Sequence, residues 1–342
     1  MTKQMGSGQI VAGLVFAVSA AASAAPSWHV SQRWQIGGEG GWDYLAYDAG
    51  RVYISRSDRV VVLDAKSGKQ IGEVDGLSGV HGIALADDLH RGFISNGRAN
   101  TVSVFDPSNL KTLQTVPVNG ENPDAILYDP YSKHVFTFNG HSHDASVIDA
   151  ANGKLLGKIA LPGKPEFAVS DGRGHVYDNI EDKGDLVEID PHAMKVTATW
   201  QLKNCDEPSG LAIDIAHHRL FSVCQNQNMA VTDAESGTAV ASVPIGDGPD
   251  AAAFDPQRQL AFSSNGESGT LTVVHEDDAD HFTVVQNVPT QKSARTMALR
   301  PGGDVFLSAA QFGPKPAPSA DNPHARPPVV PGSFTILVVG EK

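Results

Sequence analysis

The chain has 342 residues, of which 41% are hydrophobic and 19% charged, and 26 Lys and Arg against 39 Asp and Glu give a formal net charge of −13. This composition is typical of a globular protein and excludes a disordered chain, and two cysteines are too few for a disulfide scaffold. The excess of acidic residues argues against nucleic acid or an anionic membrane surface as a partner.

The first residues have the pattern of an export signal. Lys3 supplies a positive charge, residues 10–22 form an apolar, Ala-rich run, and Ala22-Ser23-Ala24 fits the small-x-small rule for cleavage. We therefore predict a signal peptide over residues 1–24 and a mature, periplasmic chain over residues 25–342. The apolar run is too short to span a bilayer, and because no later segment is apolar for long enough, we expect no membrane span.

The mature chain repeats one strand pattern at a nearly constant interval. A strand that ends in Asp recurs every 41 to 43 residues, and a sixth copy ends in His. The copies end at Asp64, Asp106, Asp149, Asp190, Asp233 and His275. In several copies an Asp-x-x-x-Gly turn follows, in which the carboxylate accepts backbone N–H groups and Gly adopts positive φ. Such turns join antiparallel strands.

Two further markers fall in register with this strand seven times. One is an apolar strand that opens on a polar residue, as at Asp124, and the other is a β-rich strand such as that beginning at Val135. Each unit is therefore predicted to form four short antiparallel strands, a to d in chain order. One such sheet cannot bury both faces, whereas seven arranged radially can. The sequence predicts an all-β fold, a single seven-bladed β-propeller with four antiparallel strands per blade.

The two ends of the mature chain predict how the ring closes. The last unit supplies only strands a, b and c, and residues 28–36 occupy the position of a d strand before the first unit. We expect this N-terminal strand to complete the last blade, which removes an exposed sheet edge. The last unit also carries an insertion with seven prolines, residues 314–331, between strands b and c. Such a segment is extended and semi-rigid; it either covers the channel mouth, docks a partner or has no role.

The repeated segments carry a resemblance to a known family. The segment VFTFNGHSHDASVIDAANGKLLGKI and its copy FISNGRANTVSVFDPSNLKTLQTV resemble the YVTN-repeat β-propeller family, over residues 37–340. The resemblance implies a seven-bladed, WD40-like propeller of the kind found in exported bacterial and archaeal proteins. The fourth and seventh units depart most from the pattern, since they lack its Asn-Gly turn. The shared residues build strands and turns, so the resemblance implies a fold rather than a reaction.

Propeller geometry predicts which residues meet. Strand a of each blade lines the central channel, so the residues at its start surround one mouth of the channel. These are Asp43, His81, Asp124, Glu166, Ser209, Asp250 and Arg295. Polar groups that converge in a concavity are candidates for binding a ligand, and we select all of them except Ser209 as the ligand-binding set. The alternative is that they only hold water at the channel entrance. On the opposite face, Asp129, Asp214 and Asp255 open turns that we expect their carboxylates to cap.

A metal site is a second interpretation of the same mouth. His141, His143 and Asp144 follow strand b of the third unit, and with His81 and Asp124 they offer imidazole and carboxylate ligands that suit Zn²⁺, Cu²⁺ or Ni²⁺. The alternative is that the loop histidines are simply solvated. The cofactor is otherwise unknown.

The two cysteines belong to one predicted blade. Cys205 precedes strand a of the fifth unit, and Cys224 ends strand b of that unit. Because strand b returns alongside strand a, both should lie near the mouth, within the reach of a disulfide. We expect the disulfide rather than two separate thiols.

The function indicated by these features is binding rather than a recognised reaction. G-x-S-x-G, H-E-x-x-H, P-loop and CxxCH patterns are absent. We favour an exported, monomeric binding or scaffold protein whose mouth takes a small molecule, a metal or a protein partner. The alternative is a lactonase-like hydrolase with a metal at the mouth, by analogy with seven-bladed propellers that open lactones. A third hypothesis is an accessory protein that docks a cationic partner in electron transfer or metal handling.

Overall fold

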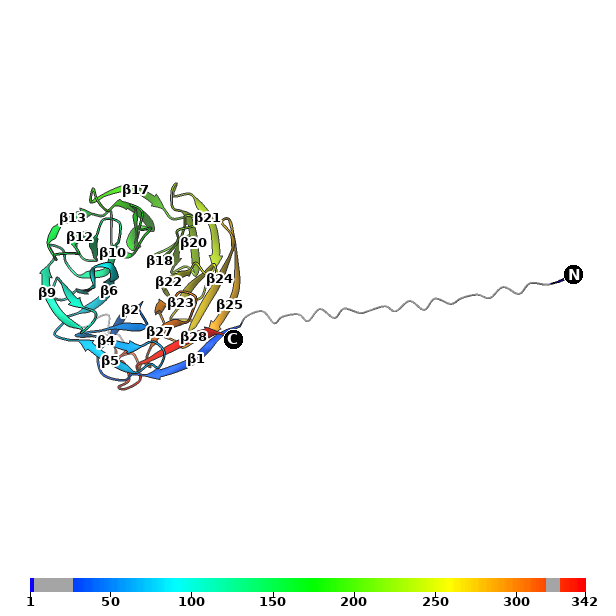
Figure 1. Cartoon of the computed structure of the whole chain (residues 1–342), viewed down its shortest axis with the longest axis horizontal. Helices are drawn as coiled ribbons and strands as arrows, with labels where there is room; N and C mark the ends of the chain where they lie inside the picture. Colours follow the sequence, from blue (N-terminus) through cyan, green and yellow to red (C-terminus); the bar gives the residue numbers. More distant parts are fainter. Residues whose placement is uncertain (3–26, 318–326) are drawn as a thin grey trace.

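Seven four-stranded antiparallel sheets stand radially around one axis in the computed structural model, which describes residues 1–2, 27–317 and 327–342 (Figure 1). The predicted seven-bladed propeller with four strands per blade is therefore confirmed. The predicted signal peptide lies outside the described residues apart from its first two, as does the middle of the Pro-rich insertion. No helix in the described ranges is long and apolar enough to cross a bilayer.

Each of the first six blades is one continuous stretch of chain whose strands a to d run from the axis outward. Blade 1 is β2 (Trp42–Asp48), β3 (Arg51–Arg56), β4 (Arg59–Asp64) and β5 (Gln70–Val74). Blade 2 is β6 (Val80–Ala86), β7 (Arg91–Asn96), β8 (Thr101–Asp106) and β9 (Lys111–Pro117). Blade 3 is β10 (Pro123–Asp129), β11 (His134–Asn139), β12 (Asp144–Asp149) and β13 (Leu155–Ala160).

Blades 4 to 6 continue the same order. Blade 4 is β14 (Pro165–Ser170), β15 (Val176–Ile180), β16 (Asp185–Asp190) and β17 (Lys195–Gln201). Blade 5 is β18 (Pro208–Asp214), β19 (Arg219–Cys224), β20 (Asn228–Asp233) and β21 (Ala239–Pro244). Blade 6 is β22 (Pro249–Asp255), β23 (Leu260–Asn265), β24 (Thr270–Asp278) and β25 (His281–Pro289). Two short 3₁₀ turns, Asp87–Leu89 and Glu181–Lys183, complete the regular structure.

The last blade joins the two ends of the ring. It consists of β26 (Thr296–Leu299), β27 (Val305–Ala309), β28 (Thr335–Glu341) and, as its outer strand, β1 (Trp28–Gln35). β1 pairs antiparallel with β28 from Trp28 opposite Glu341 to Gln35 opposite Thr335. The expected closure by the N-terminal strand is therefore confirmed, and in Figure 1 β1 and β28 lie side by side at the rim.

The core lies between the blades. Seven clusters of buried apolar side chains occupy the seven junctions between neighbouring blades in the described part of the chain. A buried aromatic residue stands at the same position of strand b in every blade: Tyr53, Phe93, Phe136, Tyr177, Phe221, Phe262 and Phe306. Truncating one such ring to Ala typically costs about 3–5 kcal/mol of stability. Because strand a is the innermost strand of every blade, the first residues of the seven a strands surround one opening.

Candidate functional site

The channel mouth is a small cavity built from the first residues of the a strands. Asp43, His81, Asp124, Glu166 and Asp250 are each the second residue of their strand. Arg295 directly precedes β26. All six line a cavity of about 240 Å³. The structure thus brings together the six residues selected from the sequence.

β-Bulges explain why the mouth also has an apolar floor. In blade 1 the pairing of β2 with β3 shifts register between Trp42 and Leu45, which leaves one extra residue in β2. A bulge redirects side chains, so that Asp43 and Tyr44 both face the cavity. The same shift occurs in blade 4, and there Phe167 faces the cavity beside Glu166.

Tyr44 and Phe167 meet across the channel. Their rings stack with centroids 5.5 Å apart, and the Tyr44 hydroxyl donates a 3.1 Å hydrogen bond to the backbone carbonyl of Glu166. Blades 1 and 4 are thereby linked directly through the channel. Sequence reasoning missed both aromatic residues, because strict alternation along strand a would turn the residue after the mouth position away from the channel.

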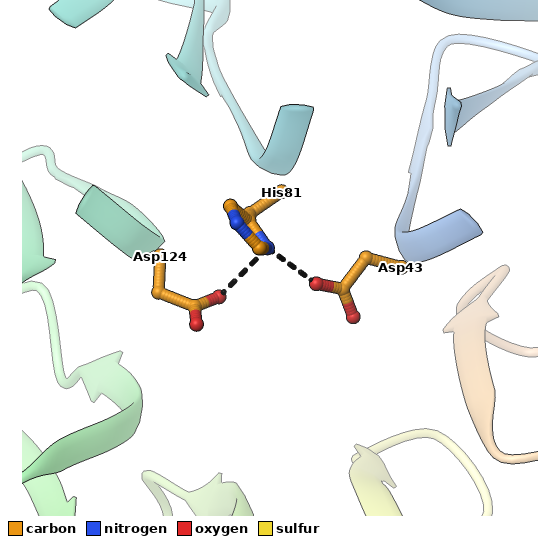
Figure 2. A group of neighbouring side chains, drawn as sticks. All are labelled: Asp43, His81 and Asp124. Carbon is orange, nitrogen blue, oxygen red and sulfur yellow. Dashed lines mark hydrogen bonds and ion pairs between the residues drawn. The ribbon is translucent and has the colours of Figure 1, made fainter. Parts of the chain in front are cut away.

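His81 lies between two aspartates, as Figure 2 shows. Its Nδ1 is 2.7 Å from Asp43 Oδ2 and 3.4 Å from Asp124 Oδ1. Burial lowers the pKa of His81, but the hydrogen bond to Asp43 and the charges of Asp124 and Asp43 outweigh burial and hold that pKa above its usual value. The imidazole is therefore biased toward its charged form, and it shares its Nδ1 proton with an acidic neighbour.

Two permanent cations pair with the remaining carboxylates. Arg295 donates to Asp250 at 2.6 Å and lies 3.7 Å from Asp43. Lys164, which directly precedes β14, has its Nζ 3.1 Å from Glu166 Oε2 and also contacts Glu181. Sequence reasoning missed Lys164 because it belongs to the loop before strand a rather than to the strand.

Three acid groups at the mouth, Asp124, Glu166 and Asp250, have pKa values above the usual range. Burial raises the pKa of Asp124 to about 6, and the charge of Asp43 adds to the rise, while His81 and Lys164 oppose it. Burial likewise raises the pKa of Glu166 to about 8, against the opposing charge of Lys164. Burial also raises the pKa of Asp250, in spite of Arg295. Four carboxylates thus share a confined space with too little positive charge to stabilise all of them as anions.

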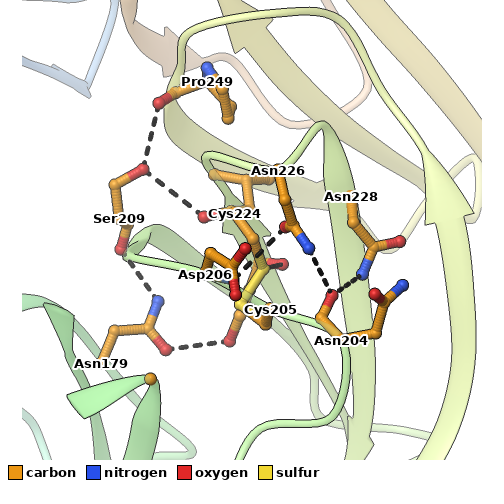
Figure 3. Close-up of a disulfide and its surroundings, with 12 residues drawn as sticks. Asn179, Asn204, Cys205, Asp206, Ser209, Cys224, Asn226, Asn228 and Pro249 are labelled. Carbon is orange, nitrogen blue, oxygen red and sulfur yellow. Dashed lines mark hydrogen bonds between the residues drawn. A yellow bond between two sulfur atoms is a disulfide. The ribbon is translucent and has the colours of Figure 1, made fainter. Parts of the chain in front are cut away.

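Ser209 does not join the cavity lining. It is 3% exposed, and its hydroxyl donates to the backbone carbonyl of Pro249 at 3.2 Å (Figure 3). In this blade the residue at the mouth position therefore ties strand a of blade 5 to strand a of blade 6.

The potential metal ligands group differently from the sequence expectation. Within residues 27–317 and 327–342, the groupings of three such side chains are Asp43–His81–Asp124 and Asp214–His217–Glu276. His81 and Asp124 are thus joined by Asp43. His141 and His143 are exposed and belong to neither group.

Asp144 is engaged elsewhere. It is 6% exposed, it accepts hydrogen bonds from Asn139 at 2.6 Å and Ser142 at 3.1 Å, and it pairs with Lys158 at 2.5 Å. Its carboxylate therefore has donors and a counter-ion within its own blade.

The predicted disulfide is present on the mouth side of blade 5. Cys205 and Cys224 are bonded, with their Cα atoms 5.1 Å apart. Figure 3 shows the bond inside a polar loop, where the side-chain amides of Asn226 and Asn228 donate to the carbonyl of Asn204 at 3.2 and 2.7 Å. The bridge ties the loop that enters the blade to the end of β19.

The base of the Pro-rich insertion lies at the rim of the mouth. Phe312 forms an isolated bridge with Val329, and its ring stacks on Trp42 with centroids 5.8 Å apart. Both ends of the insertion are thereby anchored beside β2, while residues 318–326 lie outside the described ranges.

Fold and site together define a seven-bladed β-propeller with an acidic channel mouth. No protein-family model matches the chain. A curated relative from Salmonella typhimurium, described as "Uncharacterized protein YncE", is 21% identical over 217 residues, which are 63% of this chain and 49% of the relative. The chain therefore spans about half the length of that relative. With the seven-bladed fold, this similarity supports the expected YVTN-type propeller family.

Solved structures share the fold at low sequence identity. A chain of the Kuenenia stuttgartiensis hydrazine synthase aligns with a TM-score of 0.68 and 18% identity, over 78% of this chain and 92% of that one. The WD40 repeats of RRP9 align with a TM-score of 0.77 and 9% identity, over 93% and 100%. A chain of the mitotic checkpoint complex aligns with a TM-score of 0.74 and 13% identity, over 97% and 98%. These similarities concern the fold alone.

Proposed function

We propose that this protein is an exported binding protein whose channel mouth holds a small ligand that carries positive charge. The observation that carries the proposal is the imbalance at the mouth. Asp43, Asp124, Glu166 and Asp250 face one cavity, whereas its permanent cations are Arg295 and the neighbouring Lys164. A positively charged ligand supplies the missing charge.

The raised pKa values support this choice of ligand. A carboxyl group whose pKa lies at about 6 or 8 is partly protonated near neutral pH, because its ionised form lacks a partner. A bound cation would replace those protons and favour the ionised form. Strongly perturbed acids in a cleft are themselves typical of functional sites.

Two kinds of ligand share this chemistry. A divalent metal ion would be bound by Asp43, His81 and Asp124, whose ligand atoms lie within 4.8 Å of one another. An organic ammonium group would instead donate hydrogen bonds to the carboxylates above the aromatic floor of Tyr44 and Phe167, where cation–π attraction adds to binding. The two differ in what they require of His81, which is a ligand for the metal and a competing cation for the ammonium.

Export to the periplasm fits the rest of the chain. A disulfide between Cys205 and Cys224 is a feature of oxidising compartments, and the N-terminal pattern is that of a signal peptide. The ring needs no second subunit to complete the mouth, so we propose that a monomer is sufficient for binding.

The test is a thermal-shift and calorimetric series with Zn²⁺, Mn²⁺ and 1,4-diaminobutane as probes. We expect Asp124→Asn to weaken whichever probe binds by about 10- to 100-fold, since one charge near 4 Å contributes up to about 4 kcal/mol at an effective dielectric of 20. Asp58→Asn is the matched control, because Asp58 is exposed on the same face and is not part of the cavity lining. Equal weakening by both variants, or no binding of any probe, would contradict the proposal.

The variant His81→Ala separates the two kinds of ligand. If His81→Ala no longer binds the probe, the ligand at the mouth is a metal ion, because the imidazole was one of its ligands. If His81→Ala binds the probe equally well or more tightly, the ligand is an ammonium group. Arg295→Ala should tighten binding of either cation, because it removes a competing positive charge from Asp250 and Asp43.

We propose one second candidate function, a metal-dependent lactone hydrolase. The grouping of Asp43, His81 and Asp124 beside an open cavity favours it, since a metal there would polarise a carbonyl and Glu166 would exchange protons near neutral pH. Purified protein should then open a simple lactone in the presence of Zn²⁺ or Mn²⁺, and Glu166→Gln should abolish turnover. If the protein binds a metal but does not hydrolyse the lactone, the hydrolase is excluded and the proposed binding function stands.

A further inference from the structure

A second group of potential metal ligands lies on the face of the ring opposite the mouth, between blades 5 and 6. It consists of Asp214 at the end of β18, His217 in the turn that follows, and Glu276 in β24. One ligand atom from each residue lies within 4.8 Å of the others. None of the three takes part in the mouth, so their arrangement needs an explanation of its own.

Glu276 departs from the repeat. In the first five blades, the residue after the end of the repeated strand is Ala or Pro: Ala65, Pro107, Ala150, Pro191 and Ala234. Glu276 occupies the equivalent position in blade 6, because its N–H donates to the carbonyl of Gln259 at 2.9 Å as that of Ala150 donates to Lys133 at 3.0 Å. The backbone hydrogen bond at this position is therefore the same, although β24 continues through Glu276 to Asp278, whereas the equivalent strands of the first five blades end one residue before this position. The side chain has changed from a small apolar group to a carboxylate.

This carboxylate is buried without a donor. Glu276 is 1% exposed, and neither of its carboxylate oxygens has a hydrogen-bond partner among the described residues. A buried carboxylate is strongly unfavourable unless it is paired or binds a metal. The side chain points at His217, whose Nδ1 is 3.3 Å from Glu276 Oε1.

The neighbouring turn does not supply the missing donor. His217 Nδ1 also lies 2.8 Å from Asp214 Oδ2, yet within the described part of the chain this nitrogen forms no hydrogen bond of acceptable geometry. The Asp214 carboxylate accepts the backbone N–H groups of Ala216 and His217 at 3.0 and 3.2 Å, so it caps the turn as expected. Three side chains thus converge on one point without satisfying one another.

Equivalent turns show what blade 6 would supply in the absence of a ligand. Asp129, at the same position in blade 3, accepts a hydrogen bond at 2.6 Å from Ser170 of blade 4. Asp255 of blade 6 accepts one at 3.0 Å from the backbone of Gly302 in blade 7. In both cases the next blade donates to the turn. At Asp214 the next blade presents a second carboxylate instead, which is the arrangement expected when a cation lies between them.

We propose that Asp214, His217 and Glu276 bind a divalent transition-metal ion, with Zn²⁺ as the best match, that joins blades 5 and 6. Zn²⁺ takes imidazole and carboxylate ligands at about 2.0–2.2 Å, and tetrahedral bonds of that length separate ligand atoms by about 3.3 Å. The distances of 2.8 and 3.3 Å from His217 Nδ1 require little adjustment. Ca²⁺ and Mg²⁺, which require six or more oxygen ligands, fit poorly.

The position suits a site that is fixed on one side and accessible on the other. The side chains of Asp214 and Glu276 are 4% and 0% exposed, whereas that of His217 is 36% exposed. A metal can therefore enter past the imidazole, and water can complete the coordination there. The bound ion would link a turn of blade 5 to a strand of blade 6 and so stabilise their junction.

The competing occupant is a proton. Burial raises the pKa of Glu276 to about 7, and the charge of Asp214 adds to the rise. Metal binding should therefore be measured at pH 8, where protonation competes least.

The test uses Zn²⁺ as the probe, with the full mature chain first stripped by a chelator. Calorimetry and metal analysis should show one Zn²⁺ site whose affinity falls by more than about 100-fold in Glu276→Ala and Glu276→Gln. A decrease of that size exceeds the effect of losing a residue that only supports a ligand. Asp277→Asn is the matched control, because it removes the same charge one residue along the strand and should leave Zn²⁺ binding unchanged. His81→Ala should also leave this Zn²⁺ in place, which separates it from any metal at the mouth.

Thermal unfolding provides a second readout that is independent of the calorimetric titration. Zn²⁺ should raise the melting temperature of the wild type but not that of Glu276→Ala. In chelator, Glu276→Ala should melt at or above the wild type, because Ala is the residue that other blades carry there. The proposal is overturned if the wild type binds no Zn²⁺ at pH 8, if both Glu276 variants bind it equally well, or if the bound Zn²⁺ is lost in His81→Ala instead.

Discussion

Breaking the bond between Cys205 and Cys224 should destabilise the whole ring by a predictable amount. The two residues are separated by 19 positions, so the bond closes a loop of about 20 residues in the unfolded chain. In the chain-entropy treatment, a loop of that length stabilises the folded state by about 3 kcal/mol. The bond also joins the loop before β18 to the end of β19, and so it restrains one side of the mouth.

The change in melting temperature follows from the size of the chain. An unfolding entropy of about 2.1 cal/mol/K per residue gives about 0.7 kcal/mol/K for a propeller of this length, so that 3 kcal/mol corresponds to a shift of about 4–5 °C. Because Cys224 is fully buried and Cys205 is 6% exposed, reductant will not reach the bond in the folded protein. The chain must therefore be unfolded, reduced and refolded before the comparison.

The assay compares calorimetric unfolding of the oxidised and the reduced, refolded protein. The oxidised form should melt about 4–5 °C higher, and the double variant Cys205→Ala/Cys224→Ala should melt at the same temperature with and without reductant. Reduced and oxidised protein that melt within 1 °C of each other would refute the reasoning, since the loop would then be held equally well by its hydrogen bonds and packing.

Three further predictions concern stability and binding. Arg56 is 1% exposed and lies over the ring of Phe334, and its guanidinium donates to the backbone carbonyls of Gly37, Glu39, Gly40 and Gly41. Arg56→Met should therefore destabilise the junction of β1 and β2 by about 3 kcal/mol in denaturant unfolding. An unchanged unfolding midpoint would disprove this role. Gly237 and Gly50 both have positive φ, but a Cβ at Gly237 would clash with Trp200, whereas a Cβ at Gly50 meets nothing. Gly50→Ala should lower the free energy of unfolding by about 1 kcal/mol, and Gly237→Ala should lower it by more. Equal losses of stability in the two variants would contradict the clash. Cation binding at the mouth should tighten as the pH rises from about 5 to 9, because Asp124 and Glu166, with pKa values of about 6 and 8, must lose their protons to bind the cation. If calorimetry shows an affinity that falls as the pH rises, Asp124 and Glu166 are excluded as ligands.

The fold was predictable because each blade repeats the same pattern of strands and turns. The strand that ends at Asp64 returns five times at nearly the same interval, and each repeat forms a third strand of a sheet. Such a unit is stable only against its neighbours, so the number of repeats determines the number of blades. The closing strand was predictable for the same reason, since the last unit lacks one strand and residues 28–36 have its pattern.

The list of mouth residues was predictable, but their contacts were not. Position along strand a places Asp43 and His81 at the mouth in any propeller, whereas the pairing of His81 with Asp43 depends on side-chain directions. The bulge in β2, which brings Tyr44 into the cavity, has no separate signal in the sequence. His141 and His143 follow strand b on the mouth face, but their position in the repeat does not reveal that their side chains are exposed in a turn.

Glu276 is a residue that sequence reasoning missed although its signal was present. Aligning the repeats places a carboxylate where the other blades have Ala or Pro. The alignment alone does not reveal that this position is buried, nor that Asp214 and His217 of the preceding blade face it. That information requires the radial packing of blade 6 on blade 5.

A crystal structure of the protein with the cation that stabilises it most would test the central claim most directly. We predict density for that cation inside the channel mouth, in contact with Asp124 and with at least one of Asp43 and Glu166. A bound cation that lies outside the mouth, or a mouth whose carboxylates keep only the partners described here, would contradict the account.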